Sequence, residues 1–245
     1  MLQHDYRCHY SYILCRNDNL TRQLYELTQK QQHRQNHDHL SKITMLQFFY
    51  PPQPSRIWPE SNIFKRLSRS SQWDAEIKYN GWRILLFKLK NKLLIYNRHN
   101  SIIDIDHKIF MPHFVDVPND TIFDGELVHF RTTDLKNIMV FWDTPFYNGS
   151  DLRKQPLSNR RSYLSHFATA PETLQLKNAA QIFKVQQFSN GAELYDSIIK
   201  RNNKLEEGII YKQILSIYES HIKRGIDVTT WLKCRKISDS SKVTA

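Results

Sequence analysis

The sequence has few cysteines and no long apolar run, and each absence excludes a class of protein. The three cysteines among the 245 residues, Cys8, Cys15 and Cys234, are too scattered for a disulfide framework and lack the spacing of zinc ligands. Such cysteine usage is typical of an intracellular, reducing compartment. No apolar segment approaches the ~20 residues of a membrane span, and no signal-peptide pattern opens the sequence. We therefore expect an intracellular protein with no membrane partner.

Acidic residues are scarce relative to basic ones. There are 24 Asp and Glu against 35 Lys and Arg, which gives a net charge of +11. This excess favours a polyanionic partner, because each phosphate that a Lys or Arg neutralises releases condensed counterions. An acidic membrane surface would satisfy the same charge, but the lack of an apolar span favours nucleic acid. The length and a hydrophobic content of 40% allow a sizeable core in one large domain or two small ones.

Composition divides the chain into three parts. We expect residues 1–50 to be a polar, flexible extension, residues 51–236 to form the folded domain, and residues 237–245 to be a polar tail or linker. The run that starts at Met45 repeats the first three residues of the chain, so residues 1–44 are interpreted as an appended extension.

Strand signals dominate the predicted domain. Alternating apolar residues with many aromatic and β-branched side chains predict strands at 75–78, 83–90, 92–97, 122–130, 137–142, 209–212 and 229–235. Helical spacing predicts helices at 160–167 and 192–200. Sequential strands with occasional helices are typical of an α+β domain with mainly antiparallel sheets.

The run Lys78-Tyr79-Asn80-Gly81-Trp82-Arg83 is the most informative stretch of the chain. A lysine followed by a glycine three residues later suits an amine nucleophile beside a tight turn, and the arginine offers a bidentate fork for phosphate. Alone, this hexamer is weak, because exposed strands often carry Lys and Arg. It gains weight from four blocks that follow in order: Asp124-Gly125-Glu126, Trp142-Asp143, Glu207-Gly208 with Lys212, and Trp231-Leu232-Lys233.

This ordered set resembles the covalent nucleotidyltransferases, and most closely the ATP-dependent polynucleotide ligases of the DNA ligase type. The resemblance covers about residues 56–236 and includes Tyr96-Asn97-Arg98 and the segment 149–161. It implies an adenylation-domain fold, in which two mainly antiparallel β-sheets with flanking helices enclose a nucleotide cleft. It also implies ATP and Mg²⁺ as cofactors and nicked duplex nucleic acid, DNA more than RNA, as the partner.

The resemblance implies that Lys78 attacks the α-phosphate of ATP and becomes lysyl-AMP. AMP then passes to a 5′-phosphate, and a 3′-hydroxyl displaces it to seal the nick. An ordinary lysine, with a pKa of ~10.4, is protonated near neutrality. Desolvation or nearby cations must therefore lower that pKa, and Arg83, Lys233 and Arg235 are candidates for the cations. The alternative for Lys78 is an exposed strand lysine.

The remaining site residues follow from the same resemblance. It assigns nucleotide binding to Glu76, Arg83, Arg98, Glu126, Trp142, Lys212, Lys233 and Arg235. It makes Glu126 and Glu207 ligands of Mg²⁺, whose hard charge suits carboxylate oxygens. Trp142 would stack on the purine, with a core tryptophan as the alternative. Arg98 would contact ribose or phosphate, with an exposed hairpin arginine as the alternative.

Neighbours of these residues are expected to lie on the opposite strand faces. On this basis Glu206 is predicted to be solvated, and Cys234 is predicted to be a small core residue. Two positions depart from the family pattern. Asn80 stands where the family has Asp and carries no charge, and Arg235 replaces a lysine with a planar fork.

Ligases of this type normally carry an OB-fold domain after the last block, and residues 237–245 do not form one. We therefore expect slow self-adenylylation by this chain alone. It is interpreted as a fragment, as a minimal enzyme, or as one half of an assembly with a separate OB-fold domain or partner chain. The alternatives are an RNA ligase, an mRNA-capping guanylyltransferase, or an inactive nucleic-acid-binding module. The block at Glu207 favours a ligase over a capping enzyme, and retention of Lys78, Glu126 and Lys233 argues against an inactive module.

Overall fold

The computed structural model of the chain describes residues 47–128, 136–174 and 180–237. Its folded unit begins at Phe48. The predicted boundary after residue 50 is therefore too late. Phe49 is buried and the Tyr50 N–H donates to the His221 carbonyl over 2.9 Å, so these aromatic residues are part of the domain. The rest of the predicted extension and the tail from 238 onward lie outside the described residues.

Strands make up most of the described residues. A four-stranded sheet has the order β1-β11-β10-β2, and a larger sheet has the order β4-β3-β5-β6-β9-β8, with β7 paired to β6. Their bounds are β1 Gln53–Arg56, β2 Trp73–Tyr79, β3 Trp82–Leu89, β4 Lys92–Asn97, β5 Thr121–Val128, β6 Ile138–Tyr147, β7 Ser150–Asp151, β8 Ala168–Thr169, β9 Gln181–Lys184, β10 Glu206–Gln213 and β11 Asp227–Arg235.

Both sheets are mainly antiparallel. The exceptions are the parallel pairs β1 with β11, β6 with β9 and β8 with β9. The predicted α+β class with two sheets is confirmed, and each of the seven predicted strands lies within or overlaps an observed strand. Short strands β1, β7, β8 and β9 were not predicted, because two to four residues are too few to establish a period of two.

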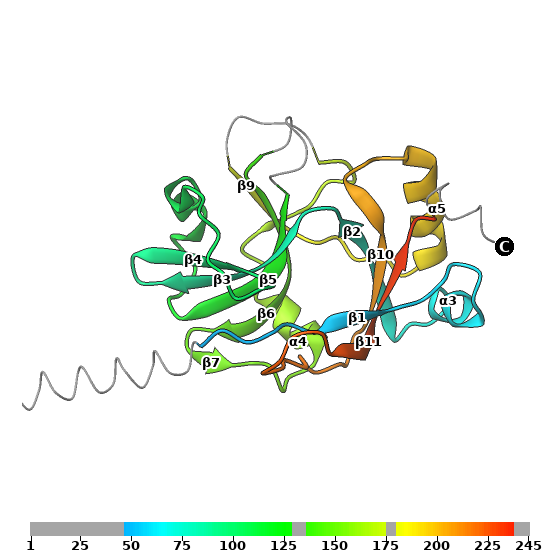
Figure 1. The fold of residues 1–245 in the computed structure, drawn as a ribbon, viewed down its shortest axis with the longest axis horizontal. Helices are drawn as coiled ribbons and strands as arrows, with labels where there is room; N and C mark the ends of the chain where they lie inside the picture. Colours follow the sequence, from blue (N-terminus) through cyan, green and yellow to red (C-terminus); the bar gives the residue numbers. More distant parts are fainter. Residues whose placement is uncertain (1–46, 129–135, 175–179, 238–245) are drawn as a thin grey trace, which may run out of the picture. The chain divides into compact units, whose positions relative to one another are not determined.

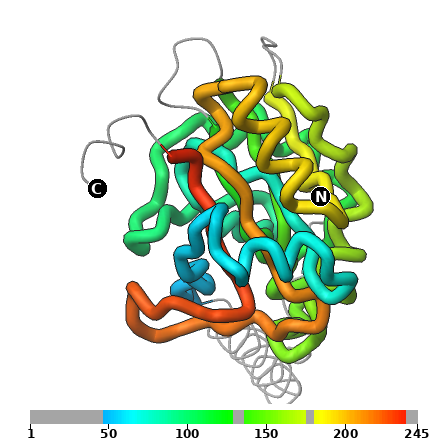
Figure 2. The backbone as a smooth tube through the Cα atoms, turned by 90° about the vertical axis from the view of Figure 1, so that its right-hand side faces the viewer, coloured from blue at the N-terminus to red at the C-terminus, as the bar shows by residue number. Residues whose placement is uncertain are grey.

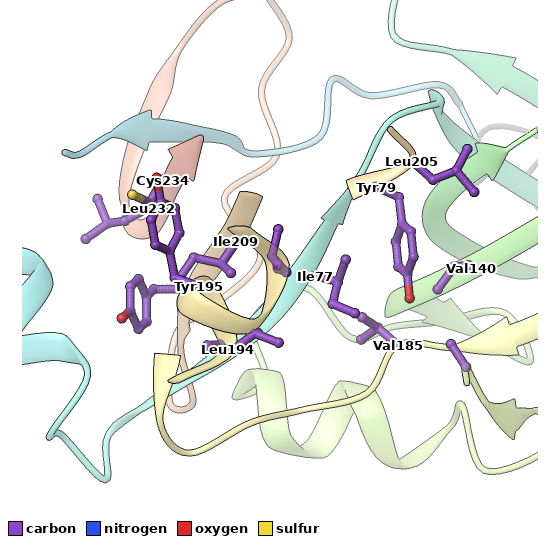
Figure 3. Close-up of a cluster of buried hydrophobic side chains, with 14 of the residues drawn as sticks. Ile77, Tyr79, Val140, Val185, Leu194, Tyr195, Leu205, Ile209, Leu232 and Cys234 are labelled. Carbon is purple, nitrogen blue, oxygen red and sulfur yellow. The ribbon is translucent and has the colours of Figure 1, made fainter. Parts of the chain in front are cut away.

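Helices cover one side of the smaller sheet. α3 (Asn62–Leu67) and α5 (Gly191–Arg201) lie on the outer side of β2 and β10, as Figures 1 and 2 show from two directions. Ile77, Ile209 and Leu232 of the strands belong to one buried apolar cluster with Leu194 of α5, which Figure 3 shows in close-up. Burial of this apolar face fixes which side of each strand remains for the cleft.

The predicted helix at 160–167 is shifted in the structure. The helix, α4, runs from Leu157 to Ser162. Pro156 immediately precedes it, and beyond Ser162 the backbone continues in tighter turns, with the Leu164 N–H donating to the Arg161 carbonyl over 2.9 Å. Helix α5 confirms the prediction at 192–200. Two short 3₁₀ helices, η1 (His107–Ile109) and η2 (Met111–Phe114), complete the elements. None of the described helices is long and apolar enough to cross a membrane.

Candidate active site

The chain crosses from one sheet to the other directly after Lys78. Strand β2 of the smaller sheet ends at Tyr79, and β3 of the larger sheet begins at Trp82. At the crossover, a Cβ on Gly81 would lie 2.5 Å from the Leu127 carbonyl oxygen, so only glycine lets the chain pass this close to β5. The Gly81 N–H also donates to Glu126 Oε1 over 3.0 Å. Glycine at this turn therefore brings the lysine strand and Glu126 together.

Strand alternation places the other blocks on the same side of the smaller sheet. Ile77 and Ile209 face α5, so Glu76 and Lys78 of β2 and Lys212 of β10 face the other way. On β11 the side chains directed away from the core are Trp231, Lys233 and Arg235. Cys234 lies between them on the core face and is fully buried, as predicted.

Glu207 reaches this side only because of a β-bulge. Pairing between β10 and β2 shifts register between Glu206 and Gly208, and Gly208 has a φ of +142°. Simple alternation from Lys212 back along the strand would place Glu206, not Glu207, toward Lys78. The bulge directs Glu207 instead of Glu206 toward Lys78, and the Lys78 ammonium donates to Glu207 Oε2 in a short contact.

Replacing Gly208 with alanine should open this bulge. A Cβ there would lie 2.1 Å from the Cys234 carbonyl oxygen, and its backbone angle is one that side-chain-bearing residues rarely adopt. We expect a loss of more than about 3 kcal/mol in the free energy of unfolding, measured by urea titration. Gly149→Ala is the control, because its φ of +75° is also positive but its nearest neighbour is 3.9 Å away. Equal losses in the two variants would show that the close packing at Gly208 is unimportant.

The structure gathers every predicted site residue in one cleft of about 780 Å³. That size accommodates a nucleotide-sized ligand. The residues lining it include Glu76, Lys78, Arg83, Arg98, Glu126, Trp142, Glu207, Lys212, Lys233 and Arg235. These side chains come from both sheets and are separated by up to 159 residues in sequence, taking 235 minus 76. Their individual roles remain predictions, but their common location is a finding.

Ion pairs link the charged residues at the Lys78 end of the cleft. Glu207 contacts Lys78 and also lies 3.4 Å from Arg235 Nη2. Burial, together with the charges of Arg235 and Lys78, lowers the pKa of Lys233 below its usual value, against the opposing effect of Asp227. The Glu207 carboxylate at this end therefore contacts both an amine and a guanidinium group.

Comparison with known proteins shows which families and relatives this chain resembles. The family described as "ATP dependent DNA ligase domain" matches residues 129–235, from the end of β5 to the end of β11. The SPbeta prophage-derived DNA ligase-like protein LigB of Bacillus subtilis (strain 168) is 25% identical over 176 residues, which are 65% of this chain and 59% of the relative. The DNA ligase of vaccinia virus (strain Western Reserve) is 23% identical over 186 residues, covering 66% of this chain and 31% of the ligase.

Solved structures share the fold. A mycobacterial DNA ligase D complexed with ATP and MES superimposes with a TM-score of 0.56 at 19% identity, over 76% of this chain and 60% of that one. The ligase domain of LigD from M. tuberculosis gives a TM-score of 0.55 at 18% identity. Residues 129–235 of this chain therefore match the ATP-dependent DNA ligase domain family, and the fold is similar to that of ligase domains. It spans about three fifths of the bacterial relative and about a third of the viral one.

In this ligase-type domain, Arg83 does not present a free fork. Its Nε and Nη2 donate to Asp124 over 3.0 and 2.6 Å, and Nη1 donates to the Pro52 carbonyl. The Tyr218 hydroxyl donates to the same Asp124 over 2.8 Å. The fork is thus already paired in the structure, and phosphate binding by Arg83 stays a prediction. Its guanidinium lies 5.5 Å from the Trp142 ring centroid.

Glu76 and Lys212 form the buried floor of the cleft. Lys212 Nζ lies 2.8 Å from Glu76 Oε2, and Arg161 contacts the other Glu76 oxygen. The same ammonium lies 4.8 Å from the Trp142 ring centroid and 4.1 Å from that of Trp231. Burial first, and then the Arg161 charge, hold the pKa of Lys212 well below its usual value. Trp142 is only partly buried and lines the cleft, which keeps the stacking prediction open.

The two predicted metal ligands fit a magnesium ion by their chemistry. Burial raises the pKa of Glu126 to about 7, and the nearby Glu207 charge adds to the rise against opposing effects of Lys78 and Arg83. Two mutually repelling carboxylates favour a cation between them. The described residues contain no group of three or more His, Cys, Asp or Glu side chains that could hold a metal ion.

Asn80 and Glu206 have structural partners that the sequence did not reveal. The Asn80 side-chain amide donates to the Lys204 carbonyl over 3.2 Å, a bond that the family's usual Asp could not donate. Glu206 is on the opposite face from Glu207, as predicted, but the prediction that it is solvated is wrong. It is buried and paired with Arg201 of α5 at 3.2 Å.

Sequence reasoning missed the residues that support the site. Arg160 forms a fully buried ion pair with Asp143 at 2.8 Å, Arg161 holds Glu76, and Tyr218 holds Asp124. One sequence signal was available for the arginines. Two of them are adjacent in an amphipathic segment, and the strands of the domain carry isolated acidic residues with which they could pair. Tyr218 gave no comparable signal.

Proposed function

We propose that this chain is a DNA ligase-type adenylyltransferase that uses ATP to seal nicks between a 5′-phosphate and a 3′-hydroxyl. The single observation that supports this most is the common cleft of the predicted site residues, with Glu207 in contact with both Lys78 and Arg235 of β11. Covalent transfer requires an amine, a place for the nucleotide and positive charge at the phosphates, and the cleft has groups suited to each.

In the proposed first step, Lys78 Nζ attacks the α-phosphorus of ATP. An N–P bond forms, the bond from that phosphorus to the bridging oxygen breaks, pyrophosphate leaves, and the amine loses its proton. Attack needs a free lone pair, so the Lys78–Glu207 ion pair must open first. Lys233 and Arg235 would neutralise phosphate charge, and Trp142 would stack on the adenine.

In the later steps, a 5′-phosphate oxygen of the nicked strand attacks the same phosphorus and releases Lys78. The 3′-hydroxyl then attacks the 5′-phosphate, an ester bond forms, and AMP leaves. Glu126 and Glu207 would hold Mg²⁺, which supplies charge neutralisation to the phosphates when it is bound. Nicked duplex DNA is the proposed substrate, and a separate OB-fold domain or partner chain is the proposed helper that engages it. We propose an intracellular location from the cysteine usage alone.

The nucleotide that labels the chain separates this proposal from its alternatives. With Mg²⁺ and α-³²P-ATP, we expect label that stays with the chain in denaturing electrophoresis, and little label from α-³²P-GTP. Preferential labelling by GTP would instead indicate capping chemistry. No label from either would indicate a binding module or a fragment that needs its partner domain.

The choice of strand then tests the substrate. A nicked duplex whose 5′-phosphate is pre-adenylylated should be sealed when both strand ends are DNA. Sealing only with an RNA strand would assign the chain to RNA joining. Supplying the pre-adenylylated strand bypasses the first step, so the result does not depend on how fast the chain labels itself.

A further inference from the structure

Arg56 lies at the edge of the smaller sheet, next to the cationic end of the cleft. It is the last residue of the edge strand β1, and its Cα pairs with that of Lys233 on β11 (Figure 1). Residues paired across neighbouring strands direct their side chains to the same face of a sheet. Ile57 belongs to the buried cluster on the helix side, so alternation places Arg56 on the cleft side. Pro54 and Lys233 line the cleft, and Arg56 extends that face beyond them.

The indole ring of Trp58 holds the Arg56 guanidinium in place. The guanidinium carbon Cζ lies 3.9 Å from the ring centroid, and Trp58 is 53% exposed. Stacking occupies the flat face of a guanidinium and leaves the N–H groups in its plane able to donate. Within the described part of the chain, Arg56 forms no ion pair with a carboxylate, whereas Arg83 and Arg160 do. Arg56 is therefore a positioned cation that lacks an anion.

Positive charge accumulates where β1 and β11 meet. Burial lowers the pKa of Lys233 most, against the opposing effect of Asp227. The charges of Arg235, Lys78 and Arg56 lower it further, so Arg56 is close enough to Lys233 for the two to repel each other. An anion bound beside both groups would relieve this repulsion, because an opposite charge favours the charged form of each.

The order of the strands relates Arg56 to the proposed nucleophile. Lys78 is on β2, at the opposite edge of the same sheet, with β10 and β11 in between. Neighbouring strands are ~4.8 Å apart, so three steps separate the two backbones by about 14 Å. In phosphoryl transfer the leaving group departs in line with the attacking atom, and so away from it. A lysine, a triphosphate and an arginine are together long enough to span this gap past Lys233.

We propose that Arg56 binds the pyrophosphate group that leaves when Lys78 attacks ATP, and that Trp58 is the positioning residue for Arg56. This inference rests on the proposed function, which supplies ATP as the ligand. In that step an N–P bond forms, and the bond from the α-phosphorus to the bridging oxygen breaks. The electron pair stays on pyrophosphate, whose negative charge increases. A guanidinium held at the sheet edge stabilises that charge as it develops.

Two nucleotides that differ in the leaving group test the inference at equilibrium. α,β-Methylene-ATP has a carbon in place of the bridging oxygen and cannot transfer AMP, whereas AMP lacks the two outer phosphates. We expect Arg56→Ala to weaken the affinity for Mg²⁺-bound α,β-methylene-ATP by at least about tenfold, as for loss of a charge-assisted hydrogen bond. Its affinity for AMP should not change, which also shows that the cleft is intact. Isothermal titration calorimetry measures both affinities.

Two further variants test how Arg56 is positioned. Arg56→Lys should retain part of the affinity for α,β-methylene-ATP, because it keeps the charge without the planar fork. Trp58→Leu should lose part of that affinity, since it keeps Arg56 but removes the ring that holds it. Lys65→Ala is the matched control, because Lys65 is an exposed cation of α3 that does not line the cleft. It should bind both nucleotides as the parent does.

A sealing assay separates pyrophosphate from nucleic acid as the ligand of Arg56. Sealing of a nicked duplex with a pre-adenylylated 5′-phosphate releases AMP and no pyrophosphate. Arg56→Ala should therefore seal this duplex at the parent rate. Slower sealing together with unchanged affinity for α,β-methylene-ATP would assign Arg56 to the nucleic acid and overturn the inference.

The inference is also overturned if Arg56→Ala binds α,β-methylene-ATP as tightly as the parent while its thermal unfolding midpoint is unchanged. Failure of the proposed function gives a different result, because the parent itself would then bind neither nucleotide, and both proposals would fall. If binding of the analogue depends on Arg56 but ATP labels no residue, the phosphate contact stands without the transfer chemistry.

Discussion

Replacing Lys78 with arginine should abolish covalent labelling by ATP while leaving the domain folded. Arginine keeps the positive charge and can retain the contact to Glu207, but its guanidinium stays protonated and does not attack phosphorus. We expect the rate of labelling to fall below about one thousandth of the wild-type rate. The measurement is incorporation of α-³²P-ATP under denaturing conditions, with the unfolding midpoint determined in parallel.

The choice of arginine separates the nucleophile from its charge. Lys78→Ala should lose labelling equally, but it also removes the partner of Glu207 and so changes the electrostatics of the cleft. Lys200→Ala is the matched control, since Lys200 is an exposed lysine of α5 outside the cleft, and should label normally. Persistent labelling of Lys78→Arg at another lysine would show that the assignment of the nucleophile is wrong.

Asp143→Ala should produce the largest loss of stability of any single charge removal in the domain. The side chains of Asp143 and Arg160 are both fully buried, with bonds of 2.8 Å from Nε and from Nη2 to the two carboxylate oxygens. Removing the carboxylate leaves a buried guanidinium that retains its contacts to the Gln155 and Ser216 carbonyls but has no counter-charge. We expect a loss of about 3–5 kcal/mol in the free energy of unfolding, measured by urea titration.

Asp151→Ala is the comparison for this prediction. Asp151 pairs with Arg153 through the same bidentate geometry, but its side chain is 46% exposed. An exposed pair contributes about 0–1 kcal/mol, so this variant should remain near wild type. Similar losses for Asp143→Ala and Asp151→Ala would show that burial does not decide the cost of breaking these pairs.

The buried pair also bears on the site. Asp143 directly follows Trp142 in β6, and the Ser216 carbonyl bonded to Arg160 lies between Lys212 and Tyr218 in sequence. Tyr218 in turn holds the Asp124 that engages Arg83. Two buried ion pairs, Asp143–Arg160 and Asp124–Arg83, therefore support the residues predicted to contact the nucleotide. Changes to Asp143 are expected to affect transfer through position rather than through contact with substrate.

Particular residues show how much of the site could be predicted from the sequence. Lys78, Glu126 and Lys233 could be placed on one cleft because blocks in a fixed order resemble a family whose fold brings them together, and strand alternation then sets their faces. The same alternation predicts Cys234 in the core. By contrast, the bulge at Gly208 decides which of two adjacent glutamates meets Lys78, and alternation alone selects the wrong one. The sequence did not predict the partners of Arg83 and Glu76 either, because Asp124 and Arg161 lie 41 and 85 residues away along the chain.

By itself the sequence determined the seven longer strands, the α+β class, the family resemblance and the set of residues that share the cleft. These properties depend on local periodicity and on the order of short blocks, and both can be read directly from the sequence. Only the tertiary structure decided the bulge that positions Glu207, the burial of Glu206, the pairing of Arg83 with Asp124, and the strand pairing that places Arg56 beside Lys233. Each of these depends on contacts between segments far apart in sequence, where burial and competition for hydrogen-bond partners, rather than local propensity, set the outcome.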